Sequence, residues 1–164
     1  FVVEREADGR EPLVRCINFG LDGIQSFSFT LEEERSAVLV PAGQVGTYLY
    51  EPNASVLKAG AFKQIAVRTG VKKLQVNSHL YTADHLVSDF PGRRFRVDEV
   101  LSFTGKLCKG LSKTIPQANI TVRNFPLSVE ELRKRTKITD GGHVYLFATT
   151  LVDGEKVLVK CSKA

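Results

Sequence analysis

Alternating hydrophobic and polar positions predict antiparallel strands at the start of the chain. Between residues 26 and 31, Phe27, Phe29 and Leu31 alternate with serine and threonine. This two-residue period is typical of a strand with one buried face. The same reading predicts two earlier strands, at 1–6 and 12–18, joined by a turn at 7–10.

A polar connection follows these strands and predicts a domain boundary. It begins at Glu32 and runs to Gly46, and Pro41 and Gly43 interrupt any regular structure within it. We therefore expect the chain to divide into two parts, residues 1–46 and residues 47–164.

The most apolar stretch of the sequence predicts one buried helix over residues 53–69. A short strand at 47–51 precedes it, Asn53 is a suitable N-cap, and Gly70 is a suitable end. Because apolar residues occupy most of its circumference, we expect the helix to lie between two layers of structure. Gly60 within it is expected to allow a close approach of another backbone.

Residues 94–164 have the clearest pattern, which predicts the order β-α-β-α-β-β. In the second helix Ser128 is the N-cap and Glu131 completes a capping box, while Leu127 and Leu132 form a hydrophobic staple. Residues 71–93, which precede this segment, show a mixed pattern of apolar and polar positions, with one possible strand at 80–82. The C-terminal elements are expected as strands at 95–103, 118–123, 144–151 and 156–161, a first helix at 105–112, and a two-residue hairpin turn at Asp153-Gly154. The whole pattern is that of an α+β chain.

Composition narrows the class of protein. Hydrophobic residues make up 43% of the 164 residues and charged residues 25%, which is ordinary for a globular protein. The chain begins at Phe1 and contains no methionine, so we expect a fragment or a processed product. We expect no signal peptide and no membrane span. Three widely spaced cysteines without a Cys-x-x-Cys pair favour a reducing cytoplasm and exclude a zinc ribbon.

The positive charge is concentrated in the C-terminal part. Residues 1–93 carry ten Lys or Arg against eleven Asp or Glu, whereas residues 94–164 carry thirteen against seven. The net charge of +5 therefore comes entirely from the second segment, which indicates an acidic partner such as nucleic acid. A basic, solvated surface without a partner is an equally good interpretation.

Two predicted helices carry most of these cations. Lys106, Lys109 and Lys113 follow one another at spacings of three and four, so they share one helical face. In a β-α-β-α-β-β fold both helices pack on the same face of the sheet, so their cations are expected to form one patch. The predicted nucleic-acid-binding residues are Lys106, Lys109, Lys113, Arg123, Arg133, Lys134, Arg135 and Lys137.

Other chemistry is weakly signalled. The glycines of Phe19-Gly20-Leu21-Asp22-Gly23 resemble a nucleotide-binding turn, but the third glycine and the following helix are missing, so a plain turn is the better interpretation. His79, His85 and His143 lack metal-ligand spacing. Lys106 and Lys109 are positioned to lower the pKa of Cys108, although simple packing is favoured. We predict no catalytic residue and no metal site.

Several short segments of the sequence carry a resemblance to a known family, and together they cover nearly the whole chain. They are the segments at 48–54, 57–60, 77–82, 89–92, 123–127, 131–133 and 141–142. Through them the chain resembles the C-terminal, THUMP-like region of bacterial, Bacteroides-type, class I S-adenosylmethionine-dependent methyltransferase-like proteins.

The resemblance implies an accessory role. It implies that residues 1–46 are the terminal strands and linker of a Rossmann-like methyltransferase domain, that S-adenosylmethionine binds to the longer parent protein, and that the parent's methyltransferase domain and tRNA or ribosomal RNA are partners. Two alternatives stay open. One is a structural or dimerisation module without nucleic-acid binding, and the other is a small-molecule site around Tyr48, Glu51, His79 and Tyr81.

Overall fold

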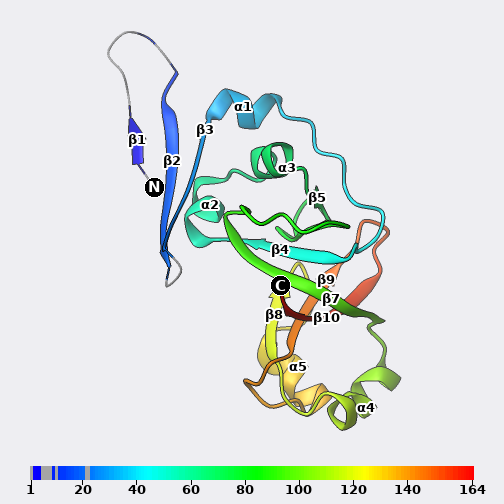
Figure 1. Ribbon diagram of the computed structural model, residues 1–164. Coiled ribbons are helices and arrows are strands. Elements are labelled where there is room, and N and C mark those ends of the chain that lie inside the picture. Colours follow the sequence, from blue (N-terminus) through cyan, green and yellow to red (C-terminus); the bar gives the residue numbers. More distant parts are fainter. Residues whose placement is uncertain (1, 5–8, 10, 21–22) are drawn as a thin grey trace.

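The computed structural model describes residues 2–4, 9, 11–20 and 23–164, and within them two β-sheets and five helices. The predicted turn at 7–10 and the ends of the predicted strand at 1–6 lie mostly outside the described residues. The smaller sheet has the antiparallel order β1-β2-β3, and it stands at one side of the molecule (Figure 1). Its strands are β1 (Val2–Glu4), β2 (Leu13–Gly20) and β3 (Gly23–Thr30).

The larger sheet has seven strands and contains the predicted β-α-β-α-β-β segment. Its order is β5-β6-β4-β7-β10-β9-β8, and all neighbours are antiparallel except β8 and β9. The helices of the segment are α4 (Gly105–Thr114) and α5 (Val129–Thr136). The strands are β4 (Tyr48–Pro52), β5 (Lys72–Lys73), β6 (Tyr81–Ala83), β7 (Gly92–Ser102), β8 (Asn119–Arg123), β9 (Tyr145–Thr150) and β10 (Lys156–Lys163). The α+β class and this order of elements are confirmed.

The prediction of a strand through Leu31 and a polar connection from Glu32 is wrong. Helix α1 (Leu31–Ser36) starts there, because Thr30 and Glu33 form a capping box. The Thr30 hydroxyl accepts a hydrogen bond from the Glu33 amide at 3.2 Å, and the Glu33 carboxylate accepts one from the Thr30 amide at 2.7 Å. Leu31 is consequently 46% exposed and does not continue the buried face of β3.

The predicted helix at 53–69 is two short helices, α2 (Ala54–Ala59) and α3 (Gln64–Thr69). Gly60 ends the first with a left-handed φ of 77°, and a Cβ there would meet no atom within 4 Å. Its role is therefore a helix end, not the predicted close approach. The expectation that this segment lies between two layers is confirmed, because Ile65 packs in one cluster with Phe29 of the small sheet and Tyr50 of the large sheet, although Val67 is 56% exposed.

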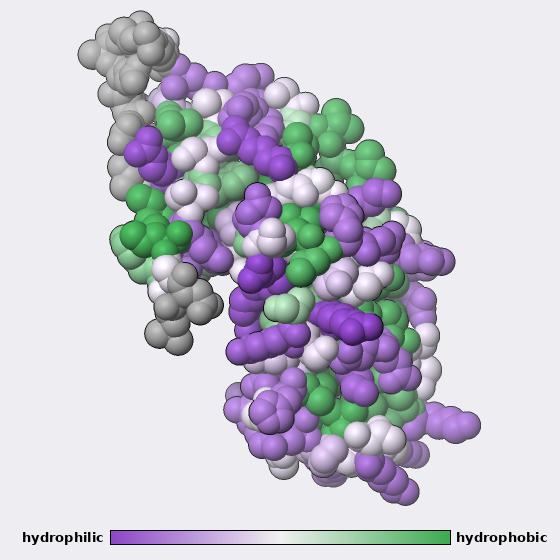
Figure 2. Space-filling model, viewed as in Figure 1, coloured by the Kyte–Doolittle hydropathy of each residue, from purple (hydrophilic) through white to green (hydrophobic). Residues whose placement is uncertain are grey.

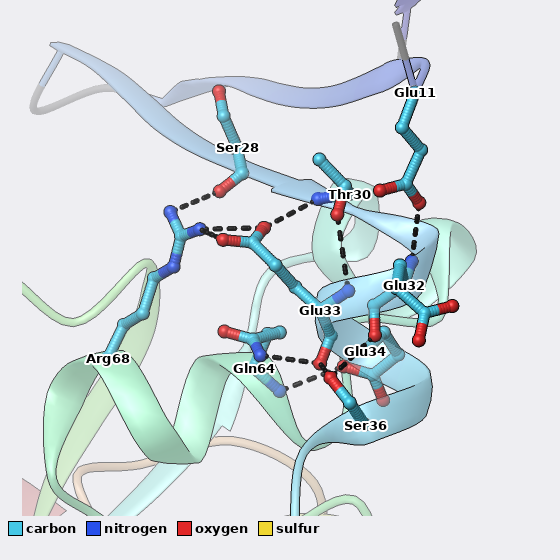
Figure 3. A network of polar contacts seen from close by, with 9 residues as sticks. All are labelled: Glu11, Ser28, Thr30, Glu32, Glu33, Glu34, Ser36, Gln64 and Arg68. Carbon is cyan, nitrogen blue, oxygen red and sulfur yellow. Dashed lines mark hydrogen bonds and ion pairs between the residues drawn. The ribbon is translucent and has the colours of Figure 1, made fainter.

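The first backbone amides of helix α3 donate hydrogen bonds to a side chain of α1 (Figure 3). Helix α3 has no side-chain cap of its own, and the Glu34 carboxylate accepts hydrogen bonds from the Lys63 and Gln64 amides instead. Arg68 donates to both carboxylate oxygens of Glu33 at 2.8 and 2.9 Å. The Thr30 amide first, and then Arg68, hold the pKa of Glu33 below its ordinary value. These contacts fix α1, which follows β3 directly, against α3.

Strands β9 and β10 are joined by residues 151–155, so the predicted two-residue turn is wrong. The Leu151 amide donates to the Glu155 carbonyl at 2.8 Å, and the Gly154 amide donates to the Leu151 carbonyl at 3.0 Å. The turn is longer than predicted because the pairing of the two strands already ends at Thr150 and Lys156.

Both faces of the C-terminal strands are buried. Leu146, Ala148 and Leu158 pack against α4 and α5, whereas Phe147 and Val159 pack on the opposite face against residues such as Leu49 and Leu80. A third cluster joins the small sheet to α2 and α3. Helices α4 and α5 therefore lie together on one face of the sheet, as the sequence predicts (Figure 1). Within the described residues, no helix combines the length and the apolar character needed to cross a bilayer.

Candidate nucleic-acid interface

Helix α4 separates its apolar residues from its lysines. The Thr104 hydroxyl caps it by accepting a hydrogen bond from the Leu107 amide at 3.1 Å. Cys108 and Leu111 are buried against the sheet. The three predicted lysines of this helix are exposed, and none forms an ion pair with a described residue; they are Lys106, Lys109 and Lys113.

Helix α5 adds a second set of cations. The capping box of Ser128 and Glu131 is confirmed, with the Ser128 hydroxyl accepting from the Glu131 amide at 3.2 Å. Lys134 and Arg135 are exposed in the last turn, where cations suit the helix dipole. Lys137, also exposed, follows as the C-cap with a left-handed φ of 63°.

A hollow of about 270 Å³ brings cations of the two helices to one place. Phe103 and Cys108 line it, Lys109 contributes from α4, and Arg135 contributes from α5. The two helices pack against each other, so their exposed cations lie on neighbouring elements. The α4–α5 surface is defined by Lys106, Lys109, Lys113, Lys134, Arg135 and Lys137.

Cys108 is not activated by its basic neighbours. Burial raises the pKa of its thiol, and the opposing effect of the Arg135 guanidinium is smaller. The possibility that flanking lysines lower this pKa is therefore wrong, and Cys108 contributes packing.

Two of the eight predicted residues do not join the α4–α5 surface. Arg133 is half-buried and donates to the carbonyls of Ala118 and Ile138, and it also pairs with Asp140. Arg133 therefore fastens α5 to the start of β8. Arg123 stands at the other end of that five-residue strand, about 13 Å from its first residue at the usual rise per residue.

Arg123 belongs to a polar cluster around a buried carboxylate. Its guanidinium donates to Glu51 Oε1, at 2.8 Å from Nη2, and the Arg93 Nε donates to Glu51 Oε2, also at 2.8 Å. The Glu51 side chain is only 5% exposed, whereas those of Arg93 and Arg123 are 54% and 37% exposed. The cluster ties β4 to β7 and β8.

Among the described residues, no hydrogen bond joins the four members of the alternative small-molecule site, Tyr48, Glu51, His79 and Tyr81. Glu51 is occupied by its two arginines, and the Tyr81 hydroxyl donates to the Phe62 carbonyl at 2.8 Å. Among the described residues, no group of His, Cys, Asp and Glu side chains is arranged to hold a metal ion.

Sequence reasoning missed a buried lysine beside this region. Lys73 is 3% exposed, and its ammonium donates to the Val76 carbonyl at 2.7 Å and lies 3.1 Å from His79 Nδ1. Burial lowers the pKa of Lys73 to about 8, with an opposing contribution from Glu34. Burial first, and then Lys73, lowers the pKa of His79. No local signal marks Lys73, because its neighbour Lys72 is exposed and identical in type.

Family models match two adjacent segments of the chain. A ferredoxin-like domain matches residues 48–91, and a THUMP domain-like family matches residues 92–163. Residues 92–163 form a THUMP-like domain. The α4–α5 surface lies entirely within it, and the two matched segments share one sheet because β4 pairs with β7.

One solved structure is strongly similar to the chain. It is a crystal structure described as a "putative methyltransferase" from Porphyromonas gingivalis W83, with 47% sequence identity and a TM-score of 0.88. The similarity covers 93% of this chain and 38% of that chain, so this chain spans well under half of that protein's length. Among curated proteins, none is significantly similar to this chain.

Proposed function

We propose that the chain is an RNA-binding accessory part of a longer, cytoplasmic, S-adenosylmethionine-dependent methyltransferase-like protein. The observation that carries the proposal is the α4–α5 surface. It presents six exposed cations without ion-pair partners among the described residues, and it lies in the THUMP-like domain. The similarity to the P. gingivalis protein supports the connection with methyl transfer.

The composition of the α4–α5 surface favours phosphate contacts. Five of its six cations are lysines, which act as point charges toward phosphate oxygens. Phosphate contacts supply affinity and orientation, while sequence is read mainly at the edges of the bases. We therefore expect this surface to bind structured RNA, such as tRNA or ribosomal RNA, with little choice of sequence.

The methyl donor is assigned to another part of the longer protein. Gly20 and Gly23, the glycines that resemble a nucleotide-binding turn, end two antiparallel strands and do not join a strand to a helix. The described residues therefore offer no glycine-rich cradle at a helix N-terminus. In this proposal residues 1–46 belong structurally to the methyltransferase part, and residues 47–164 hold the RNA.

A titration with tRNA at several salt concentrations tests the proposal. The variant Lys106→Glu/Lys109→Glu/Arg135→Glu is compared with the wild type and with Lys58→Glu/Lys72→Glu/Arg96→Glu, which makes the same change of charge at exposed positions outside the surface. We expect the first variant to bind more weakly and to lower the salt slope by about one for each phosphate that its cations no longer neutralise.

The control variant distinguishes RNA binding at the α4–α5 surface from attraction of RNA by the net charge of the protein. If both variants lose the same affinity, RNA is attracted by net charge alone. If neither loses affinity, the α4–α5 surface is a solvated face, and a supporting or dimerising module becomes the better assignment.

A further inference from the structure

The hairpin formed by β2 and β3 changes its hydrophobic face along its length. Near α1, Val14 and Cys16 on β2 lie opposite Phe29 and Phe27 on β3, and all four are buried against α2 and α3. Successive side chains of a strand point to opposite faces. Positions 17, 19 and 24 therefore lie on the other face, directed away from this core.

Phe19 and Ile24 form the apolar end of that outer face. They are direct partners in the register of the two strands, so their side chains lie side by side. Phe19 is 78% exposed and Ile24 is 69% exposed. Ile17, two residues before Phe19, shares the face and is half-buried. Figure 2 shows hydrophobic atoms at this end of the hairpin, beside the grey residues.

The inner face of the same end is polar. Asn18 and Gln25 are partners in the ladder, and Gln25 Oε1 accepts a hydrogen bond from Asn53 Nδ2 at 3.0 Å. Polar contacts thus attach the tip to the body, while the apolar side chains face outward. This is the reverse of the arrangement near α1, where the apolar face is the inner one. Such a reversal indicates that a second surface covers the tip.

We propose that the outer face of the hairpin tip, centred on Phe19 and Ile24, is the docking surface for the remainder of the longer methyltransferase-like protein. The inference rests on the proposed function for the existence of that longer protein. The similarity to the P. gingivalis chain covers so much of this chain that the whole hairpin cannot lie outside the match. It covers less than half of that chain, so most of the longer protein lies outside the matched region and is available to contact the hairpin. The α4–α5 surface is cationic and does not suit an apolar contact.

The free edge of the small sheet supports the same occupant. Among the described strands, β3 pairs only with β2; the Ser28 carbonyl of β3 accepts a hydrogen bond from Arg68, and no described strand covers the edge nearer Gly23. An apolar face beside an open edge fits a folded protein surface better than a nucleic acid. A second copy of the chain is the competing occupant, and its test is included below.

The test compares two intact proteins. Phe19→Ser/Ile24→Ser is made in this chain, and serines are placed at the aligned positions of the full-length P. gingivalis protein. Val152→Ser, at a valine that is 54% exposed outside the hairpin, is the matched control in both. We expect the double substitution to leave the thermal midpoint of this chain unchanged and to lower that of the longer protein by about 3 °C or more.

Two further measurements keep the result decisive. Hydrogen exchange of the unsubstituted proteins is expected to be slower at the hairpin tip in the longer protein, even where a variant fails to fold. Light scattering is expected to show this chain as a monomer. Equal exchange rates, an unchanged midpoint in the longer protein, or a dimer that the serines dissociate would each overturn the proposal. RNA binding is measured separately at α4–α5, so its failure would leave this result standing.

Discussion

Arg123 on β8 donates a hydrogen bond of 2.8 Å to Glu51 on β4, although three strands lie between them in the order of the sheet. In a flat sheet those strands would be separated by about 19 Å, four times the usual spacing. The contact therefore requires a strongly curled sheet. Asn124, which follows Arg123, also donates to Gln75 beyond β5, at 3.0 Å. The two edges of the seven-stranded sheet approach each other there.

This contact predicts that Glu51 stabilises the curl. Glu51→Gln removes the negative charge shared by Arg93 and Arg123, while both arginines keep partial access to water. We expect a loss of about 1–3 kcal/mol in the free energy of unfolding, measured by urea denaturation. Glu99→Gln, at an exposed position on β7, should change stability by less than about 0.5 kcal/mol. Equal effects of the two substitutions would show that the cluster adds no stability.

The start of β7 predicts a second large effect. A Cβ at Gly92 would lie 2.8 Å from the Pro52 Cα and even closer to the Glu51 carbonyl oxygen, so the backbone of β4 would have to move. We expect Gly92→Ala to cost about 1–3 kcal/mol. Gly110→Ala, in α4, meets no atom within 4 Å and should stabilise the protein by about 0.5–1 kcal/mol. The two midpoints in urea should therefore move in opposite directions.

Helix α3 provides a test of which side faces the core. Ile65 is fully buried, while Val67 is 56% exposed two residues later. Ile65→Ala should cost about 2–5 kcal/mol, and Val67→Ala should cost less than about 0.5 kcal/mol. Comparable losses measured by urea denaturation would show that both sides of the helix contribute equally to the core.

Local signals explain which elements the sequence predicted well. The capping box at Ser128 and the order β-α-β-α-β-β depend on residues close together in the chain, and both are confirmed. Helix α1 was missed although Thr30 and Glu33 have the spacing of a capping box, because Leu31 continued the alternation of the preceding strand. The break at Gly60 was missed because apolar residues continue on both sides of it.

The same distinction between local and long-range signals applies to the candidate site. The cations of α4 and α5 follow from helical spacing and from the placement of both helices on one sheet face. The positions of Arg123, Lys73 and Glu51 depend on how seven strands pair and curl. Glu51 and Arg123 are 72 residues apart, and no local period of the sequence encodes their contact.

Lys73 is a buried cation without a carboxylate within ion-pair distance among the described residues. Its ammonium lies 4.9 Å from the centre of the Phe62 ring, and the Val76 carbonyl and His79 complete its surroundings. Because burial disfavours the charged form, the pKa of Lys73 falls from an ordinary 10.5 to about 8. Between these two values the unfolded chain holds a proton that the folded chain has released.

The free energy of unfolding should therefore rise with pH in this window through Lys73, by at most about 1.4 kcal/mol per pH unit. Lys73→Met keeps the length of the side chain and removes the titration. We expect the stability of the wild type relative to this variant to be constant below pH 8 and to increase from pH 8 to about pH 10 in urea denaturation. Other titrating groups, such as the thiol of Cys161 with its pKa raised to about 12 by burial, are common to both proteins and cancel. Lys72→Met, at the exposed neighbour, should give a difference that does not change with pH. Parallel curves for both variants would show that Lys73 keeps an ordinary pKa.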